Sequence, residues 1–449
     1  MAESISLKKK TGIFAKIVLP ILITQVALYL MTFFDILMTG RYDTYHLAGV
    51  TIGSSFWVPV YTGLSGILLG LTPIIAQLIG GRKEEEVRPN VQQGLYVSIL
   101  LAVLVFVVIQ FGVRPMLHHM PLDGPVRIVA AEYLTGMSVG LIPLFMYTVL
   151  RSFFDALGAT RVSMFIILLS APINIVLNYL LIYGNFGFPE LGGAGAGYAS
   201  GITYWIVLSI AFLIAWKRKP FHGFSLFHQW QHVSWKKIME ILKIGVPIGL
   251  SIFVETSIFS VVTLFMSKYS TEVISSHQIA LNFTSLLYMV PLSISMGATI
   301  LVGQSAGASR YQDAKQYSHL GIGLAITFSF LSIAILLLFR EQIASLYTTD
   351  IAIIKLSMQF FLFAALFQLS DAVQAPIQGA LRGYKDVNVT FVMGIVSFWL
   401  IGLPVGYVTA TFTTLGPLGY WVGLIAGLTV GAIILSIRLR IMQRRFSTI

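Results

Sequence analysis

The sequence contains no cysteine and few charged residues. Without cysteine, disulfide bonds, thiolate catalysis and cysteine metal sites are excluded. Only 10% of the 449 residues are Asp, Glu, Lys or Arg, compared with about 25% in ordinary soluble domains. No GxxxxGK[ST] motif occurs, so the chain has no visible phosphate loop for ATP. A transport process would then draw its energy from an ion gradient or run passively.

Long apolar runs occupy most of the chain, which is 56% hydrophobic with a mean hydropathy of +0.84. The stretch 387–437 has no charged residue and is long enough for two membrane spans of roughly 20 residues each. Because the runs are continuously apolar rather than alternating, they predict helices and not a barrel. We expect an all-α integral membrane protein with twelve transmembrane helices, at about 12–40, 46–80, 91–115, 126–150, 162–184, 192–216, 238–267, 274–306, 317–339, 352–381, 388–410 and 416–438.

The basic residues indicate the orientation of these spans. With the N-terminus inside, 23 of the 29 Lys and Arg residues fall on the inner side. The remaining six are Arg41, Arg114, Arg127, Lys268, Arg340 and Lys355. This bias predicts that both termini are cytoplasmic. The net charge of +11 does not indicate a nucleic-acid partner, because the basic residues lie in short loops where they face lipid headgroups.

The chain contains an internal repeat. AKIVLPILIT at 15–24 matches LKIGVPIGLS at 242–251, with an offset of 227 residues. Each repeat holds six predicted helices, so the halves run parallel, as in several secondary transporters. We predict two pseudo-symmetric six-helix bundles, formed by an N-terminal lobe (1–216) and a C-terminal lobe (238–449), joined by a cytoplasmic linker (217–237).

Three acidic residues lie inside predicted spans. Glu255 and Asp371 are near the middle of two long apolar stretches, and Asp35 is toward the outer end of the first. A carboxylate at this depth costs at least about 2.5 kcal/mol and marks a candidate functional site. Each acid can be neutral with a proton, or ionised beside Na⁺ or a cationic substrate. Because these species compete for the same oxygens, the acids predict exchange of one cation for another, although a structural role stays open for each.

Aromatic and amide side chains share helix faces with these acids. Phe259 is one turn from Glu255, and Phe367 is one turn from Asp371. Such rings suit flat organic cations, but packing or lipid contact is an equal alternative. Further polar residues inside the spans either line a cavity or bridge helices: Asn174, Asn178, Gln278, Asn282 and Tyr288.

Several segments closely resemble the multidrug and toxic compound extrusion (MATE) family, specifically its NorM-like bacterial branch. They include TQVALYLMTFFDILMTG, VETSIFSVVTLF, SSHQIALNFTSLLYMVPLSISMGATILVGQ and FQLSDAVQAPIQGALRGYKD, and the resemblance covers nearly the whole chain. It implies a Na⁺- or H⁺-coupled antiporter that exports lipophilic organic cations, such as fluoroquinolones and ethidium-like dyes, from the bacterial cytoplasmic membrane. No cofactor and no enzymatic activity are expected, and a monomer suffices.

The resemblance also implies roles for particular residues. The acids that match Glu255 and Asp371 bind the coupling cation, and the acid that matches Asp35 contributes to ion or drug binding. Positions associated with drug contact in that branch match Phe259, Gln278, Tyr288 and Asp350. Some relatives place a cysteine and a tyrosine near the cation, where this chain has Ala196 and Phe367. Losing the tyrosine hydroxyl removes a possible Na⁺ ligand, so Na⁺ and H⁺ coupling both stay open.

The sequence also admits two alternative functions. A lipid-linked saccharide flippase, found among relatives of the superfamily, would carry anionic cargo and favour a basic cavity, whereas the buried charges here are acidic. A membrane-embedded enzyme could use Glu255 and Asp371 as acid and base. No pair of histidines accompanies these acids within the membrane, since His118 and His119 fall in a predicted outer loop.

Overall fold

A computed structural model describes residues 6–447 and is helical throughout its long elements. Eleven of its helices are long and apolar enough to cross a membrane. A twelfth span forms if the pair α6 (Gly124–Val139) and α7 (Leu141–Ala156), bent by 48° at Gly140, counts as one. The predicted all-α membrane fold with twelve spans is therefore confirmed. The ends of the predicted lobes at 1–5 and 448–449 lie outside the described residues.

Packing divides the chain into two compact units. The N-terminal unit comprises residues 23–249, and the C-terminal unit comprises 1–22 and 250–449. The division falls within two long helices, α1 (Leu7–Tyr42) and α10 (Trp235–Met266). In both helices it lies a few residues after the internal proline, Pro20 or Pro247. The predicted lobes, 1–216 and 238–449, differ from these units at their edges and stay a prediction about the repeat.

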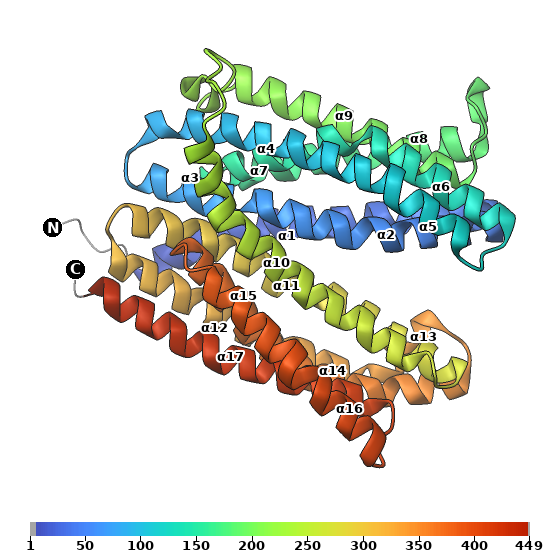
Figure 1. Cartoon of the computed structure of the whole chain (residues 1–449). Coiled ribbons are helices and arrows are strands. Elements are labelled where there is room, and N and C mark those ends of the chain that lie inside the picture. The colour runs from blue at the N-terminus through green and yellow to red at the C-terminus, as the bar shows by residue number, and fades with distance from the viewer. Residues whose placement is uncertain (1–5, 448–449) are drawn as a thin grey trace. The chain divides into compact units, whose positions relative to one another are not determined.

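Figure 1 traces the helices of both units along the chain. The other helices of the N-terminal unit are α2 (Thr44–Leu69), α3 (Leu71–Gly80), α4 (Val87–Val108), α5 (Arg114–His119), α6, α7, α8 (Thr160–Tyr183) and α9 (Gly193–Lys217). Those of the C-terminal unit are α11 (Thr271–Gly307), α12 (Tyr311–Leu338), α13 (Arg340–Tyr347), α14 (Ile351–Gly383), α15 (Asn388–Gly394), α16 (Leu403–Phe412) and α17 (Leu418–Ser447). Two π-helical segments, Ile109–Val113 and Ile395–Gly402, continue α4 and α15.

Glycine allows helices within the N-terminal unit to approach closely. A side chain at Gly197 of α9 would meet the carbonyl oxygen of Tyr133 of α6 at 2.4 Å. Small residues at helix contacts are typical of membrane proteins because they bring backbones together. In the C-terminal unit, Gly423 of α17 likewise allows a close approach. A Cβ added at this position would lie 2.4 Å from the carbonyl oxygen of Gly402.

The segment that follows α9 packs firmly on the N-terminal unit. Gln92 and Gln93 of α4 are fully buried. Gln92 donates to the carbonyl of Leu226 at 2.8 Å, and Gln93 donates to the carbonyl of His232 at 2.9 Å and accepts from the Ser234 amide at 2.9 Å. The predicted linker is thus held in place by hydrogen bonds between the side-chain amides of α4 and the linker backbone.

Candidate cation and drug site

Glu255 and Asp371 come together within the C-terminal unit. Glu255 projects from α10 and is partly buried, whereas Asp371 of α14 is only 7% exposed. Glu255 lies within electrostatic reach of Asp371, so the two carboxyl groups are near each other among apolar helices. Two ionised carboxyl groups placed in this way repel in a low dielectric. The arrangement therefore favours a proton or another cation shared between them.

The two acids have different hydrogen-bonding surroundings. Gln378 of α14 donates from Nε2 to Oε1 of Glu255 at 2.5 Å. Across residues 6–447 no group donates a hydrogen bond to the carboxyl group of Asp371. Arg382, at the end of α14, acts electrostatically on Glu255 but forms no ion pair with it. Neither acid is thus neutralised by a bound basic side chain.

Aromatic residues border this pair. Phe259 and Phe367 contact each other edge to face, with ring centroids 5.9 Å apart. Phe367 also packs against Trp421 at 5.9 Å and is only 3% exposed, so it belongs to the apolar core. Tyr288 of α11 lies within electrostatic reach of both Glu255 and Asp371. Of the predicted aromatic neighbours, Tyr288 is therefore the one that brings a hydroxyl to the acids.

Other predicted residues of the C-terminal unit lie elsewhere. Gln278 and Asn282 of α11 are exposed, and Asn282 accepts a hydrogen bond from Tyr347 at 2.9 Å. Asp350 caps α14 by accepting from the amide of Ala352 at 2.9 Å. It precedes Asp371 by 21 residues, which is about 31 Å along a helix. The structure does not bring Asp350 together with Asp371.

Asp35 lies in a polar network within the N-terminal unit. Its Oδ1 accepts from Asn178 at 2.5 Å, and its Oδ2 accepts from Ser200 at 3.4 Å. Asn178 also donates to Asn174 at 3.2 Å, and Asn174 donates to Thr203 at 3.4 Å. Asn174 and Asn178 are fully buried. The predicted amide pair therefore connects α8 to α1 and α9 and surrounds the acid with neutral donors.

Sequence reasoning missed several members of these groups. Gln378 follows Asp371 by seven residues, or two helical turns, and this spacing could have placed both on one face of α14. Ser200 and Thr203 lie one turn apart on α9, and small hydroxyl residues inside an apolar run do not stand out in the sequence. Tyr133 of α6, which Asp35 reaches electrostatically, has no signal in the sequence because it stands on a separate helix.

No cluster of metal-binding side chains supplements the acids. Within residues 6–447 there is no group of three or more His, Cys, Asp or Glu side chains placed to hold a metal ion. An alkali cation beside Glu255 and Asp371 would also use neutral oxygens. The hydroxyl of Tyr288, which lies within electrostatic reach of both acids, is of the required kind, so the residues present fit such a cation.

Comparison with known proteins identifies the family. The family model MatE matches residues 20–180 and 247–408, and the two matches begin 227 residues apart, which is the offset of the internal repeat. The chain belongs to the MatE family. This assignment confirms the resemblance seen in the sequence. The same family model matches once in each half of the chain.

Individual MatE relatives match over the full length. The chain is 52% identical over 446 residues to a probable multidrug resistance protein NorM of Bacillus licheniformis, covering 99% of each chain. It is 53% identical over 447 residues to the probable NorM of Bacillus subtilis, covering 100% of this chain and 99% of the relative. A solved outward-facing multidrug resistance MATE family transporter has a similar fold, with a TM-score of 0.89 at 20% identity over 98% of this chain and 97% of that one.

Proposed function

We propose that this protein exports lipophilic organic cations in exchange for Na⁺ or H⁺. The observation that carries the proposal is the pair formed by Glu255 and Asp371, two carboxyl groups within electrostatic reach inside apolar helices, with no ion-paired base among residues 6–447. Keeping both ionised in this setting is costly. A cation that enters the site offsets the repulsion, and a second cation can do the same only by replacing the first.

Competition for these oxygens couples the two movements. An organic cation offers its charge to Glu255 or Asp371 and its flat surface to the neighbouring rings of Phe259 and Tyr288. Arrival of Na⁺ or a proton at the same carboxyl groups weakens its hold. Gln378 keeps Glu255 oriented, because a carboxylate that accepts a charge-assisted hydrogen bond is restrained in direction as well as stabilised.

The relatives support the choice of cargo. Proteins about half identical to this chain over its full length carry the name probable multidrug resistance protein. An acidic site suits cationic compounds and disfavours the anionic cargo of a lipid-linked saccharide flippase. We place the protein in the bacterial cytoplasmic membrane with both termini cytoplasmic, because its basic residues concentrate on one predicted side. One chain holds both acids of the pair, so a monomer suffices.

Catalysis at the acid pair has no support from nearby histidine. The buried His277 lies in the same unit, but its ring is engaged by Trp421, which donates to Nδ1 at 3.0 Å, and by Thr263, which is 3.1 Å from Nε2. Both ring nitrogens are therefore occupied by structural contacts. The role that best fits the acids is cation exchange.

Reconstituted protein provides the decisive test. Ethidium-loaded proteoliposomes would be given an inward Na⁺ gradient or an inward H⁺ gradient, each imposed separately. We expect dye efflux under at least one gradient, together with movement of the driving ion in the opposite direction. Efflux that is equally fast without any gradient, or that proceeds without ion movement, would refute exchange. The gradient that drives efflux identifies the coupling ion.

A further inference from the structure

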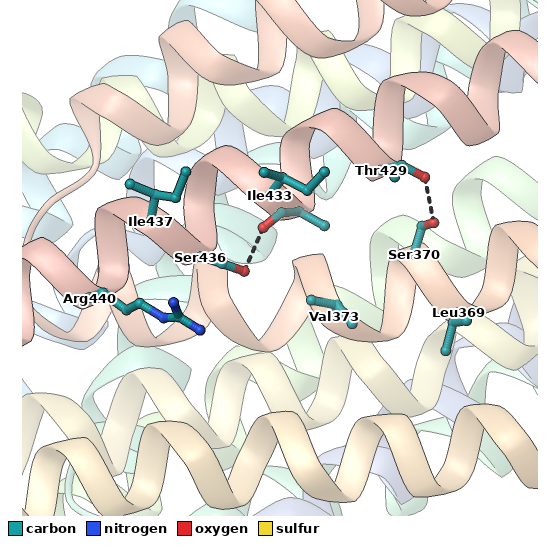
Figure 2. Close-up of a pocket in the computed structure, with 9 residues that line it drawn as sticks. Leu369, Ser370, Val373, Thr429, Ile433, Ser436, Ile437 and Arg440 are labelled. Carbon is teal, nitrogen blue, oxygen red and sulfur yellow. Dashed lines mark hydrogen bonds between the residues drawn. The ribbon is translucent and has the colours of Figure 1, made fainter.

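A groove runs between α14 and α17 of the C-terminal unit. It encloses about 400 Å³, and its walls are formed largely by aliphatic side chains of the two helices. Figure 2 shows Leu369 and Val373 on one side and Ile433 and Ile437 on the other. Ile433 and Ile437 are 56% and 53% exposed, so the groove is accessible from the apolar surface of the protein.

The hydroxyl groups in the groove are already bonded within the protein. Ser370 and Thr429 share a hydrogen bond of 2.9 Å, and Ser436 donates to the carbonyl of Ala432 at 2.6 Å (Figure 2). A hydroxyl satisfied in this way demands no polar partner from a ligand. The wall from Thr429 to Ile437 therefore presents an apolar surface, suited to a hydrocarbon chain.

Arg440 closes one end of the groove and is its single charged lining residue. It is exposed and forms no ion pair with any residue that the structure describes. Arg438, two residues earlier, contrasts with it because Asp386 binds its guanidinium at 2.6 Å and 3.1 Å. The unpaired guanidinium fits an anionic group, and a phosphate matches its fork of donors.

The length of the groove matches one leaflet of a bilayer. Eleven residues separate Thr429 from Arg440 along α17, which is about 16 Å of helix. Half of a hydrocarbon core of roughly 30 Å is about 15 Å. A chain that lies along Val373 and Ile433 would thus reach the middle of the membrane when its charged end is at Arg440, two residues beyond the predicted end of the span at 438.

We propose that this groove binds one anionic phospholipid. Its phosphate lies on Arg440, and one acyl chain lies between α14 and α17. The lipid comes from the leaflet on the side of the chain termini, which the sequence predicts to be cytoplasmic. An organic cation does not fit here, because the positive charge of Arg440 repels it. The site is therefore separate in chemistry from the acid pair and does not depend on the transport activity.

Native mass spectrometry of the detergent-purified protein tests this site. Binding of phosphatidylglycerol and of phosphatidylcholine with the same acyl chains would be titrated for the wild type, Arg440→Gln and Ile433→Trp. We expect Arg440→Gln to weaken phosphatidylglycerol binding about fivefold, since one basic side chain at an anionic surface contributes about 1 kcal/mol. Ile433→Trp should reduce binding of both lipids, because the indole fills the groove.

Two control variants separate the site from general effects. Arg161→Gln removes an exposed charge at the start of α8, and Leu331→Trp adds an indole at a 59% exposed position of α12. Both should bind lipid as the wild type does. Equal loss in Arg161→Gln and Arg440→Gln would reduce the effect to overall charge and overturn the proposal. Unchanged binding in Ile433→Trp would also overturn it, by leaving the acyl chain outside the groove.

Discussion

The two units hold their membrane-embedded acids in opposite ways. In the N-terminal unit, Asp35 accepts hydrogen bonds from Asn178 and Ser200, and the amides continue the network to Thr203. In the C-terminal unit, Asp371 lies within electrostatic reach of Glu255. Among the described residues, the one side-chain hydrogen bond to the carboxyl groups of this pair comes from Gln378. Neutral donors surround the first acid, whereas the second group has fewer donors and, under the proposed function, takes up a cation. The difference indicates that the two repeats share a helical fold but place their acids in different polar surroundings.

Removing either acid of the C-terminal pair gives the largest expected effect. Glu255→Gln and Asp371→Asn each leave one carboxyl group that no longer has to exchange cations, so dye efflux should fall to the level of empty proteoliposomes. Reconstituted efflux, normalised to the amount of folded protein, measures this. Glu341→Gln, an exposed position at the start of α13, is the matched control and should transport normally. Full efflux by both site variants would rule out these roles.

Replacing the acid of the N-terminal unit should have a smaller effect. Asp35→Asn keeps the shape of the side chain but loses charge-assisted acceptance from Asn178. Asparagine still accepts a neutral hydrogen bond, so the loss is the difference between a charged and a neutral bond, about 1–1.5 kcal/mol, and we expect efflux about tenfold slower rather than none. The same efflux measurement applies. If Asp35→Asn is as inactive as Asp371→Asn, the proposed division of chemistry between the units is wrong.

The hydrogen bond from Gln378 to Glu255 should set how tightly the C-terminal pair binds the coupling cation. Gln378→Leu frees the oxygen of Glu255 that the amide occupies, so the coupling cation should bind more tightly. We expect the cation concentration for half-maximal efflux to fall about fivefold, the equivalent of a net hydrogen bond of roughly 1 kcal/mol. Gln374→Leu, one turn away on α14 and not bonded to Glu255, should leave that concentration unchanged. A rise in Gln378→Leu would mean that the amide helps to hold the cation.

The smallest effect is expected on the stability of the Asp35 network. Asn174→Ala removes the acceptor of one Asn178 hydrogen bond and leaves a buried N–H unpaired. The free energy of unfolding should fall by about 1 kcal/mol, seen as a lower midpoint of thermal unfolding in detergent. Ser209→Ala, an exposed position on α9, should not shift the midpoint. An unchanged midpoint in Asn174→Ala would show that the network relaxes without cost.

The sequence predicts the spans well because a segment that crosses the membrane must be apolar along its length. Each predicted range overlaps a helix or a helix pair of the structure. The break at Gly140 was not predicted, since a glycine inside an apolar run gives no sign of whether the helix bends. The sequence also did not predict how far some helices extend past the membrane. α17 continues to Ser447, beyond the predicted end at 438. Hydropathy marks only the part of a helix that lies in the bilayer.

Of the candidate site, the sequence predicted the charged residues but not most of their neutral hydrogen-bonding partners. Glu255, Asp371 and Asp35 stand out because an acid inside an apolar run is rare. Ser200, Thr203 and Gln378 do not, since hydroxyl and amide residues are common in membrane helices and usually bond to their own backbone. Phe367 was predicted as a neighbour of the acid, yet its place in the core against Trp421 depends on tertiary packing that no spacing rule contains.

The buried amides of Gln92 and Gln93 have a practical consequence for chimeric proteins. Because they hold the backbone around Leu226 and His232, the segment after α9 folds as part of the first half. A hybrid joined to a relative at residue 216 would give those amides a foreign partner, whereas a junction after Ser234 would transfer each half with its own contacts. The edge of the predicted first lobe at residue 216 and the end of the segment that packs with it thus fall at different residues.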